Sequence, residues 1–509
     1  MRLYIGRAKV RPMSRRDAGI LVHPTSLPGP FGIGDLGEGS RRFMEWAADA
    51  GQCLWQMLPL GPAGSGHSPY SSSSTFAVNP LLISPTDLAE MGWSGDGQPS
   101  PPRFAGRRVE FRRVARYKER ILRACWDRFA ERGSAEAKAG LTEFLDHPDQ
   151  SGWLSDWSLF SALKRHHRGV AWTEWDEDLR LRRREALDGA RREMRAEIDF
   201  QGFLQFVVLR QWRRLRHEAR QRGIELLGDL PMYVSHDSAD VWAHPELFLL
   251  DDDSRPLKVA GVPPDYFSET GQRWGNPLYR WDRMAEDGFR WWIDRLRANL
   301  RLADRVRLDH FRGFAACWEV DAAEETAVHG CWVPGPGRAL FRAVREALGG
   351  LPVVAEDLGE ITPDVHALRD ALNLPGMRIL QFGLDGNDEH HPAHYPERCI
   401  AYTGTHDNDT SRGWFRTLSP QRQHEVLVEV GASVDNVVSR MIETLYESRA
   451  ETVVIPLQDL LDLDSSARMN RPGISDGNWS WRVTARRLTA DRCRRLGRWT
   501  ASSGRGLDR

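Results

Sequence analysis

Short runs of aliphatic and β-branched residues recur along the chain, and polar or Gly-containing sequence follows each of them. This pattern is typical of buried strands that lead into loops. The predicted strands are 19–23, 53–58, 224–229, 305–309, 352–356, 377–382, 399–403 and 452–456. Amphipathic stretches at 40–50, where Ser40 is the expected N-cap, and at 338–348 and 363–372 predict helices between them. This alternation indicates a parallel sheet covered by helices. Eight strands would close a barrel, whereas six or seven would also fit an open sheet.

The spacing of the strands is uneven, which predicts inserted subdomains. About 165 residues separate the second and third strands, and the Arg-rich amphipathic stretches 106–133 and 176–198 in this gap predict a mostly helical subdomain. About 75 residues separate the third and fourth strands, and the glycines and prolines of 259–277 favour a long functional loop there. The expected organisation is a catalytic unit at 17–485 with insertions at about 61–222 and 231–303, a flexible extension at 1–16 and a basic C-terminal tail at 486–509.

Three of the apolar runs deliver a carboxylate as they end, namely Asp309, Glu356 and Asp407. A charged group is costly to bury unless it is paired, so acids at three strand ends need an explanation. In a parallel barrel the carboxyl ends of the strands meet at one rim, where catalytic residues lie. The sequence therefore predicts that the three acids converge.

The surroundings of the acids suggest different roles for them. Arg307 lies two residues before Asp309, so both side chains face the same side of the strand, and the guanidinium favours an ionised, nucleophilic Asp309. Glu356 would need a raised pKa to protonate a leaving oxygen. Asp407, beside His406, is suited to hold sugar hydroxyls while positive charge develops. The set predicts a site of the retaining glycosidase type.

Each acid taken singly would also fit a helix N-cap or a structural ion pair. Asp229 is a fourth strand-end acid, for which substrate binding and capping remain open. His390, His391 and His394 have a metal-like spacing but stand in a polar segment, so we expect no metal site. Residues 32–37 loosely match a Gly-rich phosphate loop but lack its lysine, so we expect no nucleotide cofactor.

Composition narrows the possible partners. Seventy basic and 71 acidic residues give a net charge of -1, which argues against a nucleic-acid or anionic-membrane partner. The 20 tryptophans are mostly expected in the core, but their flat rings also stack on sugars. The N-terminal residues are basic without an apolar signal region, and no run approaches 18 apolar residues. We therefore expect a cytoplasmic protein.

Ten motifs occur in the order in which they occur in one known family. They lie at 19–37, 56–62, 68–80, 228–231, 272–277, 305–313, 355–359, 404–409, 456–459 and 468–473. The chain therefore resembles the 4-α-glucanotransferases (amylomaltases, glycoside hydrolase family 77) from about residue 17 to residue 485.

The resemblance implies a (β/α)8 TIM barrel with inserted, mostly helical subdomains. It also implies double-displacement transfer of α-1,4-glucan segments, without a cofactor, to the 4-hydroxyl of another glucan or of glucose. By motif match, the nucleophile, the acid/base and the transition-state stabiliser are Asp309, Glu356 and Asp407. The sugar-contacting positions are Tyr70, Asp229, Trp274, Arg307, His310 and His406. Residues 259–274 match the loop that covers the acceptor side.

The residues alone leave the outcome of the reaction open. A covalent glycosyl-enzyme can be resolved by a sugar hydroxyl or by water, so an α-amylase-type retaining hydrolase is the alternative. The resemblance favours transfer, with maltooligosaccharides, amylose or glycogen-type glucans as partners. A non-catalytic glucan-binding protein on a decayed barrel is a further alternative, but a decayed site would be expected to have lost one of the three acids, Arg307 or His406.

Overall fold

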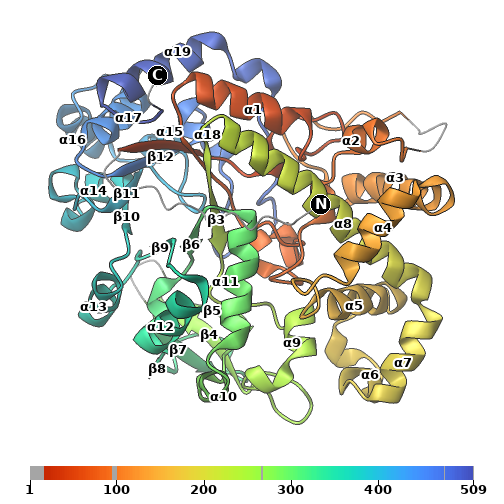
Figure 1. Ribbon diagram of the computed structural model, residues 1–509. Coiled ribbons are helices and arrows are strands. Elements are labelled where there is room, and N and C mark those ends of the chain that lie inside the picture. The colour runs from red at the N-terminus through yellow and green to blue at the C-terminus, as the bar shows by residue number, and fades with distance from the viewer. Residues whose placement is uncertain (1–15, 95–99, 265–267, 475, 508–509) are drawn as a thin grey trace.

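An eight-stranded parallel sheet in the order β10-β11-β12-β1-β2-β3-β6-β9 forms the centre of the computed structural model (Figure 1). The structure describes residues 16–94, 100–264, 268–474 and 476–507. The backbone N–H of Ala355, at the end of β9, donates to the carbonyl of Pro375, just before β10, at 2.9 Å. The two edge strands therefore meet, which confirms the predicted (β/α)8 barrel and excludes the open sheet. The barrel strands are β1 (Asp17–Leu21), β2 (Leu54–Gln56), β3 (Glu225–Leu230), β6 (Arg305–Leu308), β9 (Val353–Ala355), β10 (Gly376–Ile379), β11 (Cys399–Tyr402) and β12 (Thr452–Pro456).

Helices surround the barrel and differ in detail from their predicted bounds. The first begins at residue 38 after Gly37, and the predicted N-cap Ser40 instead donates its hydroxyl to the carbonyl of Asp35 at 2.6 Å. The strand predicted at 377–382 ends at Ile379, where the chain turns into a short helix. The helices next to the barrel are α1 (Glu38–Asp49), α8 (Arg195–Gln221), α11 (Arg290–Leu302), α12 (Gly337–Leu348), α13 (Pro363–Ala371), α14 (Leu380–Leu384), α15 (Ser411–Thr417), α16 (Pro420–Glu429), α17 (Val437–Glu447) and α18 (Leu457–Leu460).

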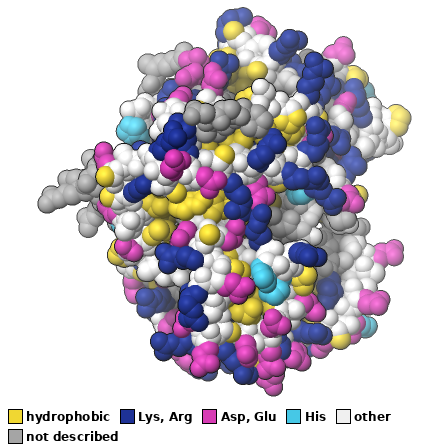
Figure 2. Space-filling model, turned by 90° about the vertical axis from the view of Figure 1, so that its right-hand side faces the viewer, with side chains coloured by type: hydrophobic (Ala, Val, Ile, Leu, Met, Phe, Trp, Pro, Cys, Tyr) yellow, Lys and Arg dark blue, Asp and Glu magenta, His cyan; other side chains and the backbone are white. Residues whose placement is uncertain are grey.

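The segment between β2 and β3 is helical, as predicted. Its helices are α2 (Pro85–Glu90), α3 (Phe111–Arg132), α4 (Ala135–Leu145), α5 (Leu154–His166), α6 (Glu177–Arg180) and α7 (Arg184–Glu193), which lead into α8. Lys118 of α3 is fully buried and donates to the carbonyls of Leu81 and Ile83 and to the carboxylate of Asp35, which anchors the subdomain to the barrel. On the face formed by these helices, basic and acidic side chains are intermingled (Figure 2).

A second, antiparallel sheet stands beside the barrel and was not predicted. It has the order β5-β4-β7-β8 and consists of β4 (Lys258–Val262), β5 (Gln272–Pro277), β7 (Ala316–Asp321) and β8 (Gly330–Pro334). The prediction of a long loop at 259–277 is therefore wrong, because the two ends of this stretch pair as a hairpin. Residues 265–267 lie outside the described part of the chain. At Gly261 a Cβ would lie 2.6 Å from the carbonyl oxygen of Gln272, so glycine permits the close pairing. The helices α9 (Ala239–Ala243) and α10 (Trp281–Glu286) belong to the same stretch of chain.

The segment expected as a basic tail contains helix α19 (Ala490–Ser502). Its buried residues Leu496, Trp499 and Thr500 lie on one face, and the indole of Trp46 in α1 donates to the carbonyl of Thr489. Arg505 is 4% exposed and donates to the carbonyls of Tyr446 and Ser448 at the end of α17 and to that of Glu451 just before β12. Of the extension predicted at 1–16, only Arg16 is among the described residues. Within the described residues, no helix is both long and apolar enough to span a membrane.

Candidate active site

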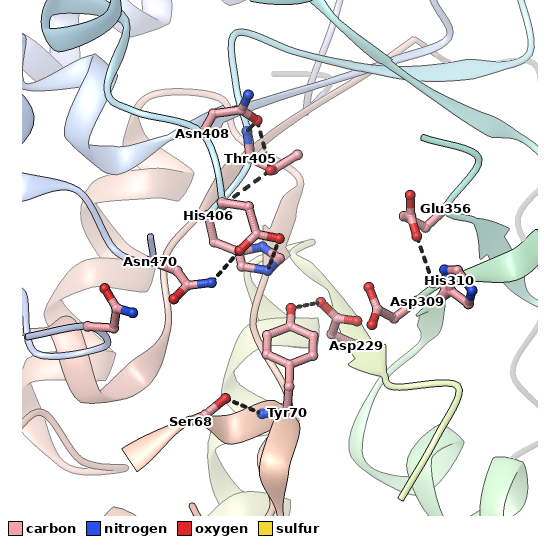
Figure 3. A network of polar contacts seen from close by, with 12 residues as sticks. Ser68, Tyr70, Asp229, Asp309, His310, Glu356, Thr405, His406, Asn408 and Asn470 are labelled. Carbon is pink, nitrogen blue, oxygen red and sulfur yellow. Dashed lines mark hydrogen bonds and ion pairs between the residues drawn. The ribbon is translucent and has the colours of Figure 1, made fainter. Parts of the chain in front are cut away.

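The predicted acids lie at the carboxyl rim of the barrel. Asp309 follows β6 directly, Glu356 follows β9 directly, and Asp407 lies in the loop after β11. Figure 3 shows Asp309 and Glu356 gathered with Asp229 beside Tyr70 and His406. The structure therefore brings together residues as far apart in the sequence as Tyr70 and His406, which are 336 positions apart. This rim is where barrel enzymes place their reacting groups.

Arg307 joins two of the acids below the rim. Its Nη1 donates to both carboxylate oxygens of Asp229, at 2.8 and 2.9 Å, and its Nη2 lies 2.8 Å from Oδ1 of Asp309. The side chain of Arg307 is 4% exposed, whereas that of Asp309 is 27% exposed. One cation between two carboxylates leaves a net negative charge, and Asp309 is the most exposed member of the group.

Asp229, expected at a sugar-contacting position, has no exposed side-chain surface. Its oxygens accept hydrogen bonds from Arg307 and from the hydroxyl of Tyr70, the latter at 2.7 Å. Burial raises the pKa of Asp229, and the guanidinium of Arg307 opposes this rise. In this arrangement Asp229 holds Tyr70 and Arg307 in place.

Glu356 is held by two backbone N–H groups. His310 donates to Oε2 at 2.6 Å, and Leu358 donates to Oε1 at 2.9 Å. Burial raises the pKa of Glu356 to about 8; Arg307 opposes the rise, and the nearby charge of Asp309 adds to it. His310, whose N–H binds Glu356, has a left-handed backbone with φ of 49°, which a non-glycine residue adopts only at a cost.

Asp407 is held by a segment that the sequence analysis did not single out for a role. Nδ2 of Asn470 donates to Oδ1 at 2.6 Å, and Nε2 of His406 lies 3.3 Å from Oδ2. Arg468 donates to the backbone carbonyl of Asp407 at 2.5 Å. The only sequence signal for these contacts is the family-like motif at 468–473, because the donors are more than 60 positions away from Asp407.

Aromatic rings line two sides of the acids. Tyr70 and His406 stack with centroids 5.0 Å apart, and Trp479, which the sequence analysis missed, lies 5.6 and 5.9 Å from them. Trp274, on β5, meets His310 edge-on at 4.7 Å and is 38% exposed. Burial lowers the pKa of His310 to about 4, so its imidazole is neutral at pH 7. Aromatic rings beside a few polar groups are typical of a site that binds a small molecule.

Two cavities flank the stacked rings. One is lined by residues that include His23, His406 and Arg468. The other is lined by residues that include Tyr70 and Asp229.

The three histidines with metal-like spacing make separate contacts. His390 accepts the backbone N–H of Ile379, whereas His391 pairs with Glu429 and His394 with Asp388. Among the described residues, no group of three or more His, Cys, Asp or Glu side chains has an arrangement that could hold a metal ion.

A (β/α)8 barrel whose rim carries an aspartate paired with arginine, a buried glutamate of raised pKa and a third carboxylate has the form of an enzyme that acts on glycosidic bonds. Comparison with known proteins agrees with this class. The chain belongs to the 4-alpha-glucanotransferase family, whose model matches residues 22–489.

Similar proteins extend over nearly the whole chain. A 4-alpha-glucanotransferase of Thermus thermophilus is 46% identical over 491 residues, which cover 94% of this chain and 97% of the relative. One of Synechocystis sp. is 46% identical over 478 residues, or 92% of this chain and 94% of the relative. The structure of an amylomaltase from Streptococcus agalactiae in complex with acarbose has a TM-score of 0.93 at 37% identity and covers 97% of this chain and 100% of that one.

Proposed function

We propose that this protein is a 4-α-glucanotransferase that moves α-1,4-glucan segments from one maltooligosaccharide or starch-type chain to the 4-hydroxyl of another glucan or of glucose. The proposal rests on family membership together with one observation: Asp309 beside Arg307 and Glu356 with a raised pKa stand at the same rim. An ionised nucleophile next to a protonated acid is what a retaining double displacement needs.

The first step breaks the donor glycosidic bond. Glu356 gives its proton to the glycosidic oxygen while a carboxylate oxygen of Asp309 attacks C1. The donor fragment beyond the bond leaves with a new hydroxyl, and the rest remains as a β-linked ester on Asp309. Asp407 faces the sugar as positive charge develops at C1, and its 46% exposed side chain is available for sugar hydroxyls.

In the second step Glu356 acts as a general base instead of a general acid. Esterification removes the negative charge of Asp309, which is one of the causes of the raised pKa of Glu356. The pKa of Glu356 therefore falls in the intermediate, and the carboxylate left after the first step accepts a proton from the acceptor 4-hydroxyl. The acceptor oxygen attacks C1, Asp309 leaves, and the α configuration is restored.

The sugar contacts follow from the rings and the charges at the rim. We assign Tyr70 and His406 to the sugar that is bonded to Asp309, and Trp274 and His310 to the acceptor side. The support is the exposed indole of Trp274 on β5 and its contact with His310, whose backbone N–H binds Glu356. Arg307 orients Asp309, and Asp229 supports Arg307 and Tyr70.

Transfer and hydrolysis give different products from maltotriose. We expect glucose together with longer maltooligosaccharides and almost no increase in total reducing ends, because each broken bond is replaced by a new one. Chromatography of the products together with a reducing-end assay measures both quantities. Release of reducing ends at a rate comparable to glucose formation would instead establish the α-amylase-type hydrolase.

The alkaline limit of activity should report the proton on Glu356. The acid must be protonated in the free enzyme, and burial raises its pKa to about 8, so kcat/KM is expected to be flat through neutral pH and to fall roughly tenfold per unit above about 8. An unperturbed glutamate would lose its proton near pH 4.3. Initial rates of maltotriose transfer across this range test the prediction. It would be contradicted if the alkaline fall in kcat/KM had its midpoint below pH 6.

We also propose a cytoplasmic location, where maltooligosaccharides and glycogen-type glucans are the available partners. All six cysteines lie in the described part of the chain, and none of them forms a disulfide. This supports a reducing compartment.

A further inference from the structure

We infer that Asn470 is a positioning residue for Asp407 and that Arg468 fixes the backbone which carries this acid. Residues 467–471, called the strap below, would then be part of the catalytic machinery. The inference rests on the proposed function of Asp407 and extends it, because no role for the strap follows from the acids themselves.

Asp407 needs an external restraint more than the other two acids do. Asp309 follows its strand directly and is paired with the buried Arg307, and both oxygens of Glu356 accept backbone N–H groups. Asp407 lies five residues beyond the end of β11 in a loop without regular structure, and its side chain is 46% exposed. A half-exposed carboxylate on such a loop would sample several rotamers unless neighbouring groups fixed it.

The strap supplies this restraint at both the side chain and the backbone. Nδ2 of Asn470 lies 2.6 Å from Oδ1 of Asp407, while the backbone N–H of Asn470 donates to the carbonyl of His406 at 3.0 Å. Nη2 of Arg468 donates to the carbonyl of Asp407, and its Nε donates to the carbonyl of Asn470 at 2.7 Å. Arg468 thus ties the strap and the loop into one unit.

The strap is itself held rigidly. The side-chain amide of Asn478 exchanges hydrogen bonds with the backbone N–H and carbonyl of Arg471, at 3.0 and 3.2 Å. The backbone N–H of Trp479 donates to the carbonyl of Met469 at 2.7 Å. Trp479 adopts a left-handed backbone, with φ of 61°, and its ring packs against His406. A costly conformation is retained only where its surroundings enforce it.

The chemistry of an amide suits this task better than that of a cation. Asp407 must keep its negative charge to stabilise a positively charged sugar, and a guanidinium on its carboxylate would compensate that charge. The amide of Asn470 orients the carboxylate without adding charge, and a carboxylate oxygen that accepts one hydrogen bond retains a lone pair for a sugar hydroxyl. The positive charge of Arg468 is directed at backbone carbonyls.

The test measures transfer by three variants across pH, with maltotriose and with maltosyl fluoride as donors. We expect Asn470→Ala to lower kcat by about 10–100-fold with both donors, with KM changed by less than about threefold, because a hydrogen bond to a charged group that acts in the transition state is lost. Asn470→Asp should regain activity at low pH, where the introduced carboxyl is protonated and donates to Asp407. It should lose activity at high pH, where two carboxylates repel each other.

Asn478→Ala is the matched control, because it loosens the strap without removing a donor to Asp407. Equal kinetic losses in Asn470→Ala and Asn478→Ala, without a pH-dependent recovery in Asn470→Asp, would overturn the inference in favour of general loop disorder. Near-normal kcat in Asn470→Ala would also overturn it. Failure of the proposed function is distinguishable, because then the wild-type protein itself would not elongate maltotriose.

Discussion

Asp309→Asn is expected to lower kcat for maltotriose transfer by roughly 10⁴–10⁶-fold, the scale on which removal of a covalent nucleophile acts. The amide is nearly isosteric but is a poor nucleophile, so the first displacement is blocked while the cleft keeps its shape. Loss of this carboxylate also leaves Arg307 paired with Asp229 alone. Discontinuous transfer assays at high enzyme concentration measure the residual rate.

Folding of the Asp309→Asn variant has to be controlled, because the substitution touches a buried cation. The variant should retain its thermal midpoint within a few degrees and should still bind a maltooligosaccharide, as measured by calorimetry. Mass spectrometry after brief exposure to maltosyl fluoride should show a glycosyl adduct on wild-type Asp309 and none on the variant. Transfer within tenfold of wild type would remove Asp309 from the role of nucleophile.

Glu356→Gln is expected to lower kcat with maltotriose by roughly 10²–10⁴-fold, the usual contribution of a general acid/base. The glutamine side chain has no proton to give to a glycosidic oxygen, and it cannot accept one from the acceptor hydroxyl. In the wild-type protein two backbone N–H groups donate to the two carboxyl oxygens of Glu356. The glutamine amide has only one oxygen, so one of these N–H groups loses its acceptor. The alkaline limb near pH 8 should disappear from the profile of the variant.

A comparison of two donors distinguishes proton donation by Glu356 from other effects of the substitution on the site. Fluoride leaves without protonation, so maltosyl fluoride should restore the first step in Glu356→Gln but not in Asp309→Asn or Asn470→Ala. Accumulation of the glycosyl-enzyme in Glu356→Gln would be the accompanying signature, since the second step still lacks its base. An equal loss with both donors would mean that Glu356 acts on the shape of the site and not as the acid.

The barrel and its acids could be predicted because their signals are local. A β-branched run such as 352–356 carries its own evidence of burial, and the acid at its end needs no distant partner to be noticed. Arg307 and Asp309 are two positions apart on one strand, so their contact follows from strand geometry.

The parts that could not be predicted depend on contacts across long sequence distances. Asn470 meets Asp407 across 63 positions, and nothing in the composition of 468–473 indicates a partner. The stretch 259–277 is rich in glycine and proline, which are typical of loops. Its ends form strands because they pair with each other and because β7, from a different insertion, pairs with β4. In α19 the arginines dominate the composition and conceal the spaced apolar residues through which the helix packs against α1 and α17.

The four-stranded sheet has a consequence for exchanging segments between this enzyme and its relatives. Strands β4 and β5 are inserted after β3, whereas β7 and β8 are inserted after β6. The two halves are joined by the β4–β7 pair and by further hydrogen bonds, such as those from Ala327 to the carbonyl of Thr270 and from Arg273 to the carbonyl of Ala322. A segment grafted from a relative into one half would have to pair with a strand of the other half that comes from this chain. The segment with β4 and β5 and the segment with β7 and β8 should therefore be exchanged together.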